Sequence, residues 1–253
     1  MMENTQIWPP LLLTFLAGLS TGIGSLVFLF VKRLKKNYLC FSLGFSAGAM
    51  IYVSFVELLS SAVSSIGFLT GNIAFFAGII FIALIDFLIP HDYIEEHVKV
   101  DKRNKKLMMA GVFTALGIAI HNFPEGLAVF MSSLKDINLG VSLAFAIAVH
   151  NIPEGIAVSM PIFYATKSRA KAFWYSLLSG IAEPIGAIIG FLVLGSFLVP
   201  TVLSFMLAFV AGIMVFISFD ELLPLSFEHN EAHISIAGII MGMLVVASSL
   251  YLL

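Results

Sequence analysis

The chain has 253 residues, of which 60% are hydrophobic and 11% are charged, and its mean hydropathy is +1.04. A soluble protein needs more polar surface, so this composition excludes one and indicates an all-α integral membrane protein with several spans. The net charge of −2 identifies no partner. The single cysteine, Cys40, excludes an internal disulfide, a CxxC redox pair and a thiolate zinc cluster. Any metal chemistry must therefore use His, Glu, Asp or Asn.

The apolar stretches predict eight transmembrane helices, because about 20 apolar residues cross the hydrocarbon core of a bilayer. We expect these spans near residues 8–31, 38–62, 70–90, 107–133, 139–165, 172–197, 200–226 and 233–253. They occupy almost the whole chain, which predicts a single transmembrane domain over residues 1–253 and no soluble catalytic domain. No basic stretch precedes the first span, so we expect it to be retained rather than cleaved as a signal peptide.

Lysine and arginine are distributed unevenly between the two sides of the predicted bundle. Of the 13 basic residues, 12 lie in the loops after the first, third and fifth spans, and Lys135 alone lies on the opposite side. Basic residues in short loops stay in the cytoplasm. Both termini are therefore expected outside the cytoplasm, as an even number of spans requires.

Two internal repeats relate the spans to one another. Residues 119–129 and 148–158, in the fourth and fifth spans, are identical at 8 of 11 positions. In the second span, residues 54–59 read Ser-Phe-x-Glu-Leu-Leu, and the same pattern recurs 164 residues later in the seventh span, at residues 218–223. Spans five apart run in opposite directions, so the second repeat is inverted. An arrangement of three spans, a central pair and three more is typical of transporters with a substrate site near the midplane.

Polar side chains concentrate at one depth of the fourth, fifth and sixth spans, where ionisable groups are costly and usually functional. They are His121, Asn122, Glu125, His150, Asn151, Glu154 and Glu183. At about 100° per residue, the glutamate of each copy lies between the histidine and the asparagine, so its carboxylate could bridge two ions. Clustered carboxylates repel one another unless they are protonated or bind a cation. We therefore predict a divalent metal centre rather than polar contacts that only hold helices together.

Pro124 and Pro153 lie beside these residues, and each removes one intrahelical hydrogen bond. The carbonyl four residues earlier then lacks its donor, which is tolerated where backbone lines a cavity or is buried in protein. Gly126 and Gly155 follow, and they could loosen the helix or allow another helix to approach closely.

The ligand types narrow the choice of metal. Imidazole, carboxylate and amide groups suit divalent zinc, iron, manganese, cobalt or cadmium, and the absence of cysteine argues against copper(I). Two histidines argue against magnesium and calcium. The ligand set does not rank zinc against iron or manganese.

The two motifs, His-Asn-Phe-Pro-Glu-Gly at residues 121–126 and His-Asn-Ile-Pro-Glu-Gly at residues 150–155, resemble those of the ZIP (Zrt-, Irt-like) family of divalent metal transporters, most closely its bacterial ZupT-like members. The resemblance covers essentially the whole chain. It implies the 3+2+3 arrangement with extracytoplasmic termini, metal import into the cytoplasm, a homodimer, and an elevator-like motion of spans 1, 4, 5 and 6.

By motif position, the resemblance also implies two adjacent metal sites. The first would consist of His121, Glu125, His150 and Glu154. The second would consist of Asn122, Asn151 and Glu183, with the glutamates of the first site bridging both metals. Some relatives have other residues at the positions of His150 and Glu183, so one or two metals could be bound at once.

Several other polar residues could contribute to the route. Glu57 and Glu221, which the inverted repeat relates, could be transient metal sites, or they could have a structural role. The loop after the third span is short, whereas many eukaryotic relatives have a long His-rich loop there. A released ion could be held weakly by that loop or by the one after the seventh span, unless both are simply solvated; the residues concerned are His91, Glu95, Glu228, His229, Glu231 and His233. Asp86 and Asp220 are weaker candidates.

A membrane-embedded di-metal enzyme of the helical-bundle oxidase type is the alternative. Such sites use Glu-x-x-His spacing without a neighbouring proline, and this chain has neither that spacing nor the His-Glu-x-x-His motif of zinc proteases. We therefore expect a non-enzymatic secondary transporter in a plasma membrane, most consistent with a bacterial cytoplasmic membrane. Its partners would be divalent metal ions as cargo, the lipid bilayer and a second copy of the chain, with no nucleic acid and no resident cofactor.

Overall fold

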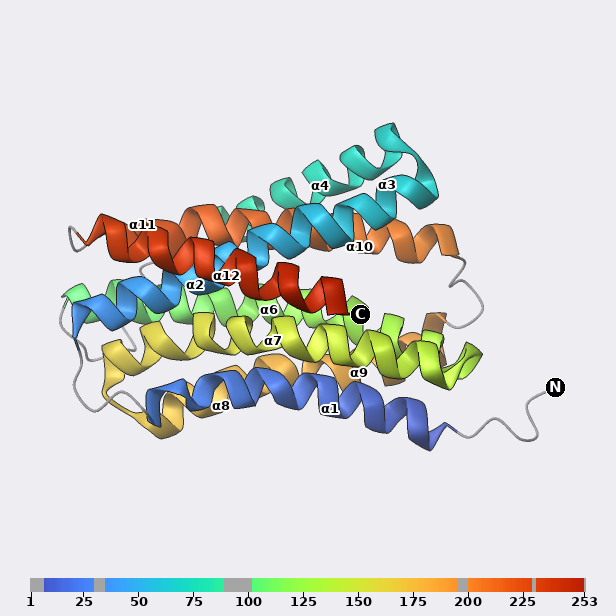
Figure 1. Cartoon of the computed structure of the whole chain (residues 1–253), viewed down its shortest axis with the longest axis horizontal. Coiled ribbons are helices and arrows are strands. Elements are labelled where there is room, and N and C mark those ends of the chain that lie inside the picture. The colour runs from blue at the N-terminus through green and yellow to red at the C-terminus, as the bar shows by residue number, and fades with distance from the viewer. Residues whose placement is uncertain (1–6, 30–34, 89–101, 195–199, 229–230, 253) are drawn as a thin grey trace.

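The computed structural model describes residues 7–29, 35–88, 102–194, 200–228 and 231–252, and every regular element within these ranges is a helix (Figure 1). The α-helices are α1 (Trp8–Ser25), α2 (Lys36–Val53), α3 (Ser60–Ile66), α4 (Phe68–Leu88), α6 (Lys102–Lys135), α7 (Ile137–Thr166), α8 (Arg169–Gly180), α9 (Ala182–Ile189), α10 (Pro200–Ile217), α11 (Leu223–Phe227) and α12 (Ala232–Leu252). A 3-10 turn, η1 (Leu26–Leu29), follows α1. Three π-helical turns occur at η2 (Ser54–Leu59), η3 (Gly190–Leu194) and η4 (Ser218–Leu222).

Seven helical segments of the described chain are long and apolar enough to cross a membrane. They are Lys36–Ile66, Phe68–Leu88, Asn104–Leu134, Ile137–Thr166, Arg169–Leu192, Thr201–Phe227 and Ala232–Tyr251, which coincide to within a few residues with the second to eighth predicted spans. α1 occupies the position of the first predicted span but is not among the seven. Its glycine, serine and threonine residues lower its hydropathy, and most of them are buried against other helices rather than exposed.

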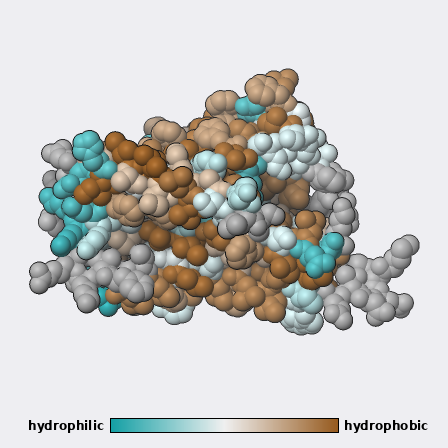
Figure 2. All heavy atoms as spheres, in the orientation of Figure 1, coloured by the Kyte–Doolittle hydropathy of each residue, from teal (hydrophilic) through white to brown (hydrophobic). Residues whose placement is uncertain are grey.

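The described surface is apolar around its middle. In Figure 2 brown atoms cover the central part of the visible face and teal atoms gather towards its two ends. Large hydrophobic side chains are exposed along α4 and α12 in particular, among them Phe76, Ile80, Ile240 and Leu244. An apolar surface of this extent is compatible with lipid and not with water. The chain is therefore a multi-pass membrane protein.

The helices pack as two groups. α1, α6, α7, α8 and α9 form what we call the site block, and α2, α3, α4, α10, α11 and α12 form the flanking block. In Figure 1, α6 and α7 lie between α1, α8 and α9 on one side and α2, α10 and α12 on the other. The main contacts between the blocks are those of α2 with α7 and of α6 with α10.

Glycines allow the closest helix crossings within each block. In the flanking block, a Cβ atom on Gly48 of α2 would lie 2.1 Å from the carbonyl oxygen of Ile239 on α12. In the site block, a Cβ atom on Gly126 of α6 would lie 2.1 Å from the carbonyl oxygen of Glu183 on α9. Small residues at such crossings let two backbones approach, which is how helices gain packing energy in a membrane.

The two copies of Ser-Phe-x-Glu-Leu-Leu share an unusual backbone. Both start a π-helical turn, η2 in the first copy and η4 in the second. The first serine, Ser54, donates to the carbonyl of Met50 at 2.7 Å, and its counterpart Ser218 donates to the carbonyl of Met214 at 2.8 Å. Because π-helical turns are rare and are frequent at functional sites, their recurrence 164 residues apart indicates that the sequence repeat is also a structural repeat.

α6 and α7 form a tight antiparallel hairpin. Asp136 alone separates them, its backbone is extended, and its side chain accepts a 2.8 Å hydrogen bond from the amide of Asn138. Both helices continue through the prolines of the two motifs, Pro124 and Pro153. The hairpin therefore brings the two motif copies side by side at one depth.

Candidate metal centre

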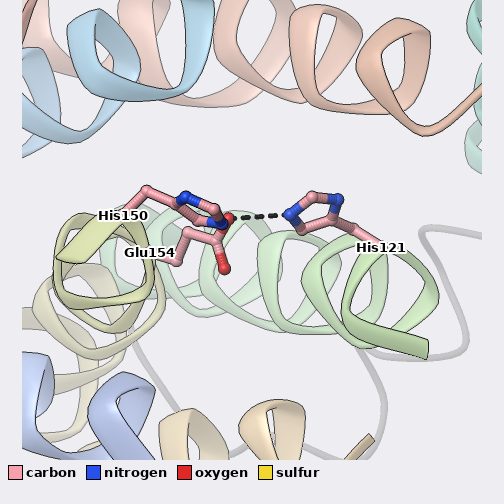
Figure 3. Close-up of side chains that lie close together, drawn as sticks. All are labelled: His121, His150 and Glu154. Carbon is pink, nitrogen blue, oxygen red and sulfur yellow. Dashed lines mark ion pairs between the residues drawn. The ribbon is translucent and has the colours of Figure 1, made fainter. Parts of the chain in front are cut away.

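The first four predicted ligands come together between α6 and α7. Nε2 of His121 lies 3.3 Å from Oε1 of Glu125 on its own helix and 3.0 Å from Oε1 of Glu154 on α7. Nε2 of His150 lies 3.0 Å from Oε1 of Glu125. Figure 3 shows His150 and Glu154 projecting from one helix towards His121 on the other. All four residues are at most 5% exposed.

These distances are those expected of atoms that share a cation. Nitrogen and oxygen ligands bind zinc at roughly 2.0–2.2 Å, which separates two ligand atoms of a tetrahedral site by about 3.3 Å. The measured separations lie between 3.0 and 3.3 Å. Ligand atoms of His121, His150 and Glu154 also lie within 4.8 Å of one another. His121, His150 and Glu154 are therefore already grouped closely enough for a single metal ion to bind them together, and Glu125 adjoins them through its contacts with both histidines.

Several buried atoms of this group have no hydrogen-bond partner among the described residues. They include Nδ1 of His121 and the Oε2 atoms of Glu125 and Glu154. Buried polar atoms are almost always paired, and a buried carboxylate without a partner is costly. A bound dication would supply both the missing contact and the missing positive charge.

The remaining three predicted ligands lie beside the first four on the same helices and on α9. Asn122 donates through Nδ2 to the carbonyl of Ser179 at 3.1 Å. Asn151 donates through Nδ2 to the carbonyl of Ala17 at 3.0 Å and to Oε1 of Glu183. These hydrogen bonds fix the orientation of both side-chain amides, because each amide nitrogen donates to a neighbouring group.

Three buried oxygens of this second set have no hydrogen-bond partner in the part of the chain that the structure describes. They are Oδ1 of Asn122, Oδ1 of Asn151 and Oε2 of Glu183. The close crossing at Gly126 brings the backbone of Glu183 against α6. The second set thus offers oxygen ligands only, whereas the first set offers oxygen and nitrogen.

A cavity of about 230 Å³ extends from the centre towards the end of the bundle at which α6 turns into α7. Glu125 and His150 line it at the centre, and Glu57, Ser61 and Ser132 line it further out. Oε2 of Glu57 is buried and lacks a hydrogen-bond partner among the described residues. The sequence left Glu57 open between a place on the metal route and a structural role, and the structure places it in the same cavity as two predicted ligands.

The other predicted residues lie away from this centre. Glu221 groups with Asp86 and Asp220, whose ligand atoms lie within 4.8 Å of one another, and none of the three is fully buried. Glu228 pairs with Lys106 at 3.5 Å. His233 is exposed near the start of α12, close to Glu231, while His91, Glu95 and His229 lie outside the described residues.

The backbone groups that anchor the asparagines were not predicted. Ser179 and Ala17 act through their carbonyl oxygens, so their side chains give no signal in the sequence. Ser46 was also missed: its hydroxyl donates to the carbonyl of Pro153 at 2.7 Å and joins α2 to α7. The contact of Ser46 with α7 could have been predicted only if the pairing of α2 with α7 had been known.

Comparison with known proteins also indicates a metal transporter. The family model described as "ZIP Zinc transporter" matches residues 89–249. The zinc transporter ZupT of Chlorobium phaeovibrioides is 55% identical over 265 aligned residues, covering 98% of this chain and 99% of that protein. The zinc transporters ZupT of Clostridium perfringens and Streptococcus mutans are 51% and 49% identical, and each alignment covers at least 94% of both chains.

The resemblance inferred from the two motifs is thus confirmed over the full length of the chain, and the names of the relatives indicate transport rather than catalysis. The chain belongs to the ZIP family of zinc transporters.

Proposed function

We propose that this protein is a secondary transporter that moves divalent transition-metal ions, zinc first among them, into the cytoplasm of a bacterial cell. The observation that carries the proposal is the buried group of His121, Glu125, His150 and Glu154, whose facing atoms lie 3.0–3.3 Å apart in the membrane interior. The zinc transport named for the relatives supports zinc as cargo. Iron, manganese, cobalt and cadmium share the same ligand preferences.

The centre is proposed to hold two metals. His121, Glu125, His150 and Glu154 would form the first site. Asn122, Asn151 and Glu183 would form the second, with Glu125 and Glu154 bridging. The unpaired amide and carboxylate oxygens of the second group support this assignment.

The membrane orientation follows from the basic residues. The end of the bundle with the α6–α7 turn carries the fewest lysines and arginines and is therefore proposed to be extracytoplasmic, with eight spans in a 3+2+3 arrangement and α1 as the first. The cavity with Glu57 opens from the centre towards this end. Asp86, Asp220 and Glu221 lie towards the basic end and are proposed to receive metal during release.

Transport is proposed to occur by movement of the site block against the flanking block. Glycine-to-backbone crossings lie within the blocks, whereas Gly117 of α6 faces the side chain of Ile217 on α10, and α2 reaches α7 through the hydroxyl of Ser46. Interfaces of the second kind can slide without separating close backbone contacts. We also propose that residues 1–253 form a single domain and that the protein is a homodimer.

The decisive test is metal uptake into proteoliposomes that contain the purified full-length protein. Zinc, iron(II), manganese and calcium would be compared in wild type, Glu125→Ala and the control Ser248→Ala, which changes an exposed residue of α12. Saturable zinc uptake that is lost in Glu125→Ala and kept in Ser248→Ala is expected. Equal uptake in wild type and Glu125→Ala would reject the centre, and turnover of a substrate without uptake would favour the di-metal enzyme.

A further inference from the structure

An apolar groove of about 580 Å³ lies between α6 and α10, where the two blocks meet. Its walls include Ala119, Ile120 and Pro124 on α6 and Phe205, Phe209 and Val210 on α10, and every residue that lines it is apolar. Cavities of roughly 300–1,000 Å³ are the size that binds small organic ligands. The groove contacts none of the seven predicted metal ligands directly, although Ile120 and Pro124 are adjacent in sequence to His121 and Glu125.

The position of the groove decides what can reach it. Ala119 lies at the middle of the span Asn104–Leu134, whereas Phe205 and Val210 lie in the first half of the span Thr201–Phe227, so the groove extends from the midplane into one leaflet of the membrane. Leu116, one turn from Ile120 on α6, and Phe205 on α10 are each 39% exposed, which shows that the groove opens on the outer surface of the helix bundle. At this depth a membrane protein is surrounded by hydrocarbon.

The inverted repeat gives a reason for the groove. The offset of 164 relates Ser46 to Val210, and the offset of 29 relates Pro124 to Pro153. Ser46 hydrogen-bonds to the carbonyl of Pro153 and closes the interface between α2 and α7. The counterparts, Val210 and Pro124, both line the groove, and valine has no hydroxyl to donate. One interface is therefore joined by a hydrogen bond, while its pseudosymmetric partner is left open.

We propose that one acyl chain of a bilayer phospholipid occupies this groove in the arrangement of helices described. The apolar lining, the depth within one leaflet and the lateral opening all match a hydrocarbon chain. A bound chain lies between the blocks and stabilises their present relative position. This last step rests on the proposed transport cycle, in which the site block slides against the flanking block. The binding of the chain does not rest on it.

Native mass spectrometry of the full-length protein, extracted in mild detergent from bilayers of a single phosphatidylcholine, counts retained lipid. Wild type would be compared with Ala119→Phe, which fills the groove, and with Ala237→Phe, which adds the same bulk on the exposed face of α12. The expected result is one phospholipid per chain in wild type and Ala237→Phe, and none in Ala119→Phe. Equal retention in all three overturns the proposal. Zinc binding, measured by calorimetry on the same samples, reports separately on the metal centre.

A fluorescence measurement in intact bilayers covers the case in which Ala119→Phe does not fold. The two native tryptophans, Trp8 and Trp174, would be changed to Phe, and one Trp placed at Leu116 beside the groove or at Leu244 on the exposed surface of α12. Phosphatidylcholine brominated at the middle of its chains quenches nearby Trp. Quenching at position 116 is expected at a several-fold lower bromolipid fraction than at position 244. Identical curves overturn the proposal, and so does weaker quenching at position 116, since it would mean that another copy of the chain covers the groove.

Discussion

At the scale of single residues, the centre depends on which atoms of each side chain are already engaged. The amide nitrogens of Asn122 and Asn151 are held by backbone carbonyls, and their oxygens are left without partners among the described residues. Glu183 contacts Asn151 through one carboxylate oxygen and leaves the other unpaired. Such a pattern gives each proposed second-site ligand one oxygen that a metal could bind without breaking an existing hydrogen bond.

Replacing Glu183 with glutamine is expected to reduce the number of bound zinc ions per chain from two to one. The amide keeps the shape of the side chain but lacks the negative charge, and Glu183 is the only carboxylate proposed to serve the second site alone. Equilibrium dialysis with metal analysis measures the stoichiometry directly. An unchanged value of two in Glu183→Gln would exclude this residue as a ligand.

Glu57→Gln is expected to raise the KM for zinc uptake while leaving the maximal rate nearly unchanged. Glu57 lines the same cavity as Glu125 and His150, so we expect its charge to increase the local metal concentration without holding the ion during the cycle. A cleft lined by charge of one sign raises the local concentration of the opposite ion by about 10-fold to 1,000-fold, and the increase falls steeply with ionic strength. Uptake measured as a function of zinc concentration separates the two parameters, with Val56→Ala of the same turn as control. A fall in the maximal rate alone would contradict this role.

Six of the seven candidate ligands were predictable from spacing because each copy of the motif presents its polar groups on one side of a helix, and Glu183 was predictable from its depth in the sixth span. Their anchors were not predictable, since Ser179 is 57 residues from Asn122 and Ala17 is 134 residues from Asn151. Hydrogen bonds between residues so far apart in the sequence depend on which helices pack together. The sequence pattern of a single helix carries no such information.

At the scale of helices, glycine determines how near α9 can come to α6. Gly126→Ala is expected to lower the thermal unfolding temperature and the zinc affinity together, because the new methyl group would meet the carbonyl oxygen of Glu183, which is backbone and cannot rotate away. Overpacking of this kind typically costs about 1–3 kcal/mol. Gly22→Ala is the matched control, since its nearest neighbour is the flexible end of Leu177. Equal melting temperatures in both variants would contradict the close-approach argument.

Hydropathy predicted the helices well because lipid exposure selects apolar residues along a whole span. It did not predict the π-helical turns η2 and η4, which reflect a local change in hydrogen-bond register that leaves composition unaltered. The repeated motif of Ser54 and Ser218 marked the right positions without revealing their conformation.

At the scale of the whole molecule, the distribution of basic residues predicts which end faces the cytoplasm. Cysteine introduced at Ser61, an exposed residue on the cavity, is expected to react with a membrane-impermeant maleimide in intact cells. Cysteine at His233, near the start of α12, is expected to react only after the cells are permeabilised. The native Cys40 is 0% exposed, so wild-type protein serves as the unlabelled control. The reverse labelling pattern would invert the proposed topology.

The groove between α6 and α10 could not be predicted from the sequence, because it depends on how the two blocks pack together. Val210 is an ordinary apolar residue of its helix, and the sequence singled out Pro124 only as a member of the metal-site motif. Only the meeting of the two helices, and its comparison with the hydrogen-bonded pair of Ser46 and Pro153, distinguishes them.

The single residue that links α6 to α7 also limits which insertions and deletions this protein can accept during evolution. His121 precedes Asp136 by 15 residues and His150 follows it by 14, so both histidines lie about 21–22 Å from the turn along their helices. One inserted or deleted residue between a histidine and the turn would rotate that ligand by about 100°. Loops elsewhere tolerate changes in length. In this hairpin, the number of residues between the two histidines sets their alignment. An insertion or deletion there would therefore misalign the two motif copies.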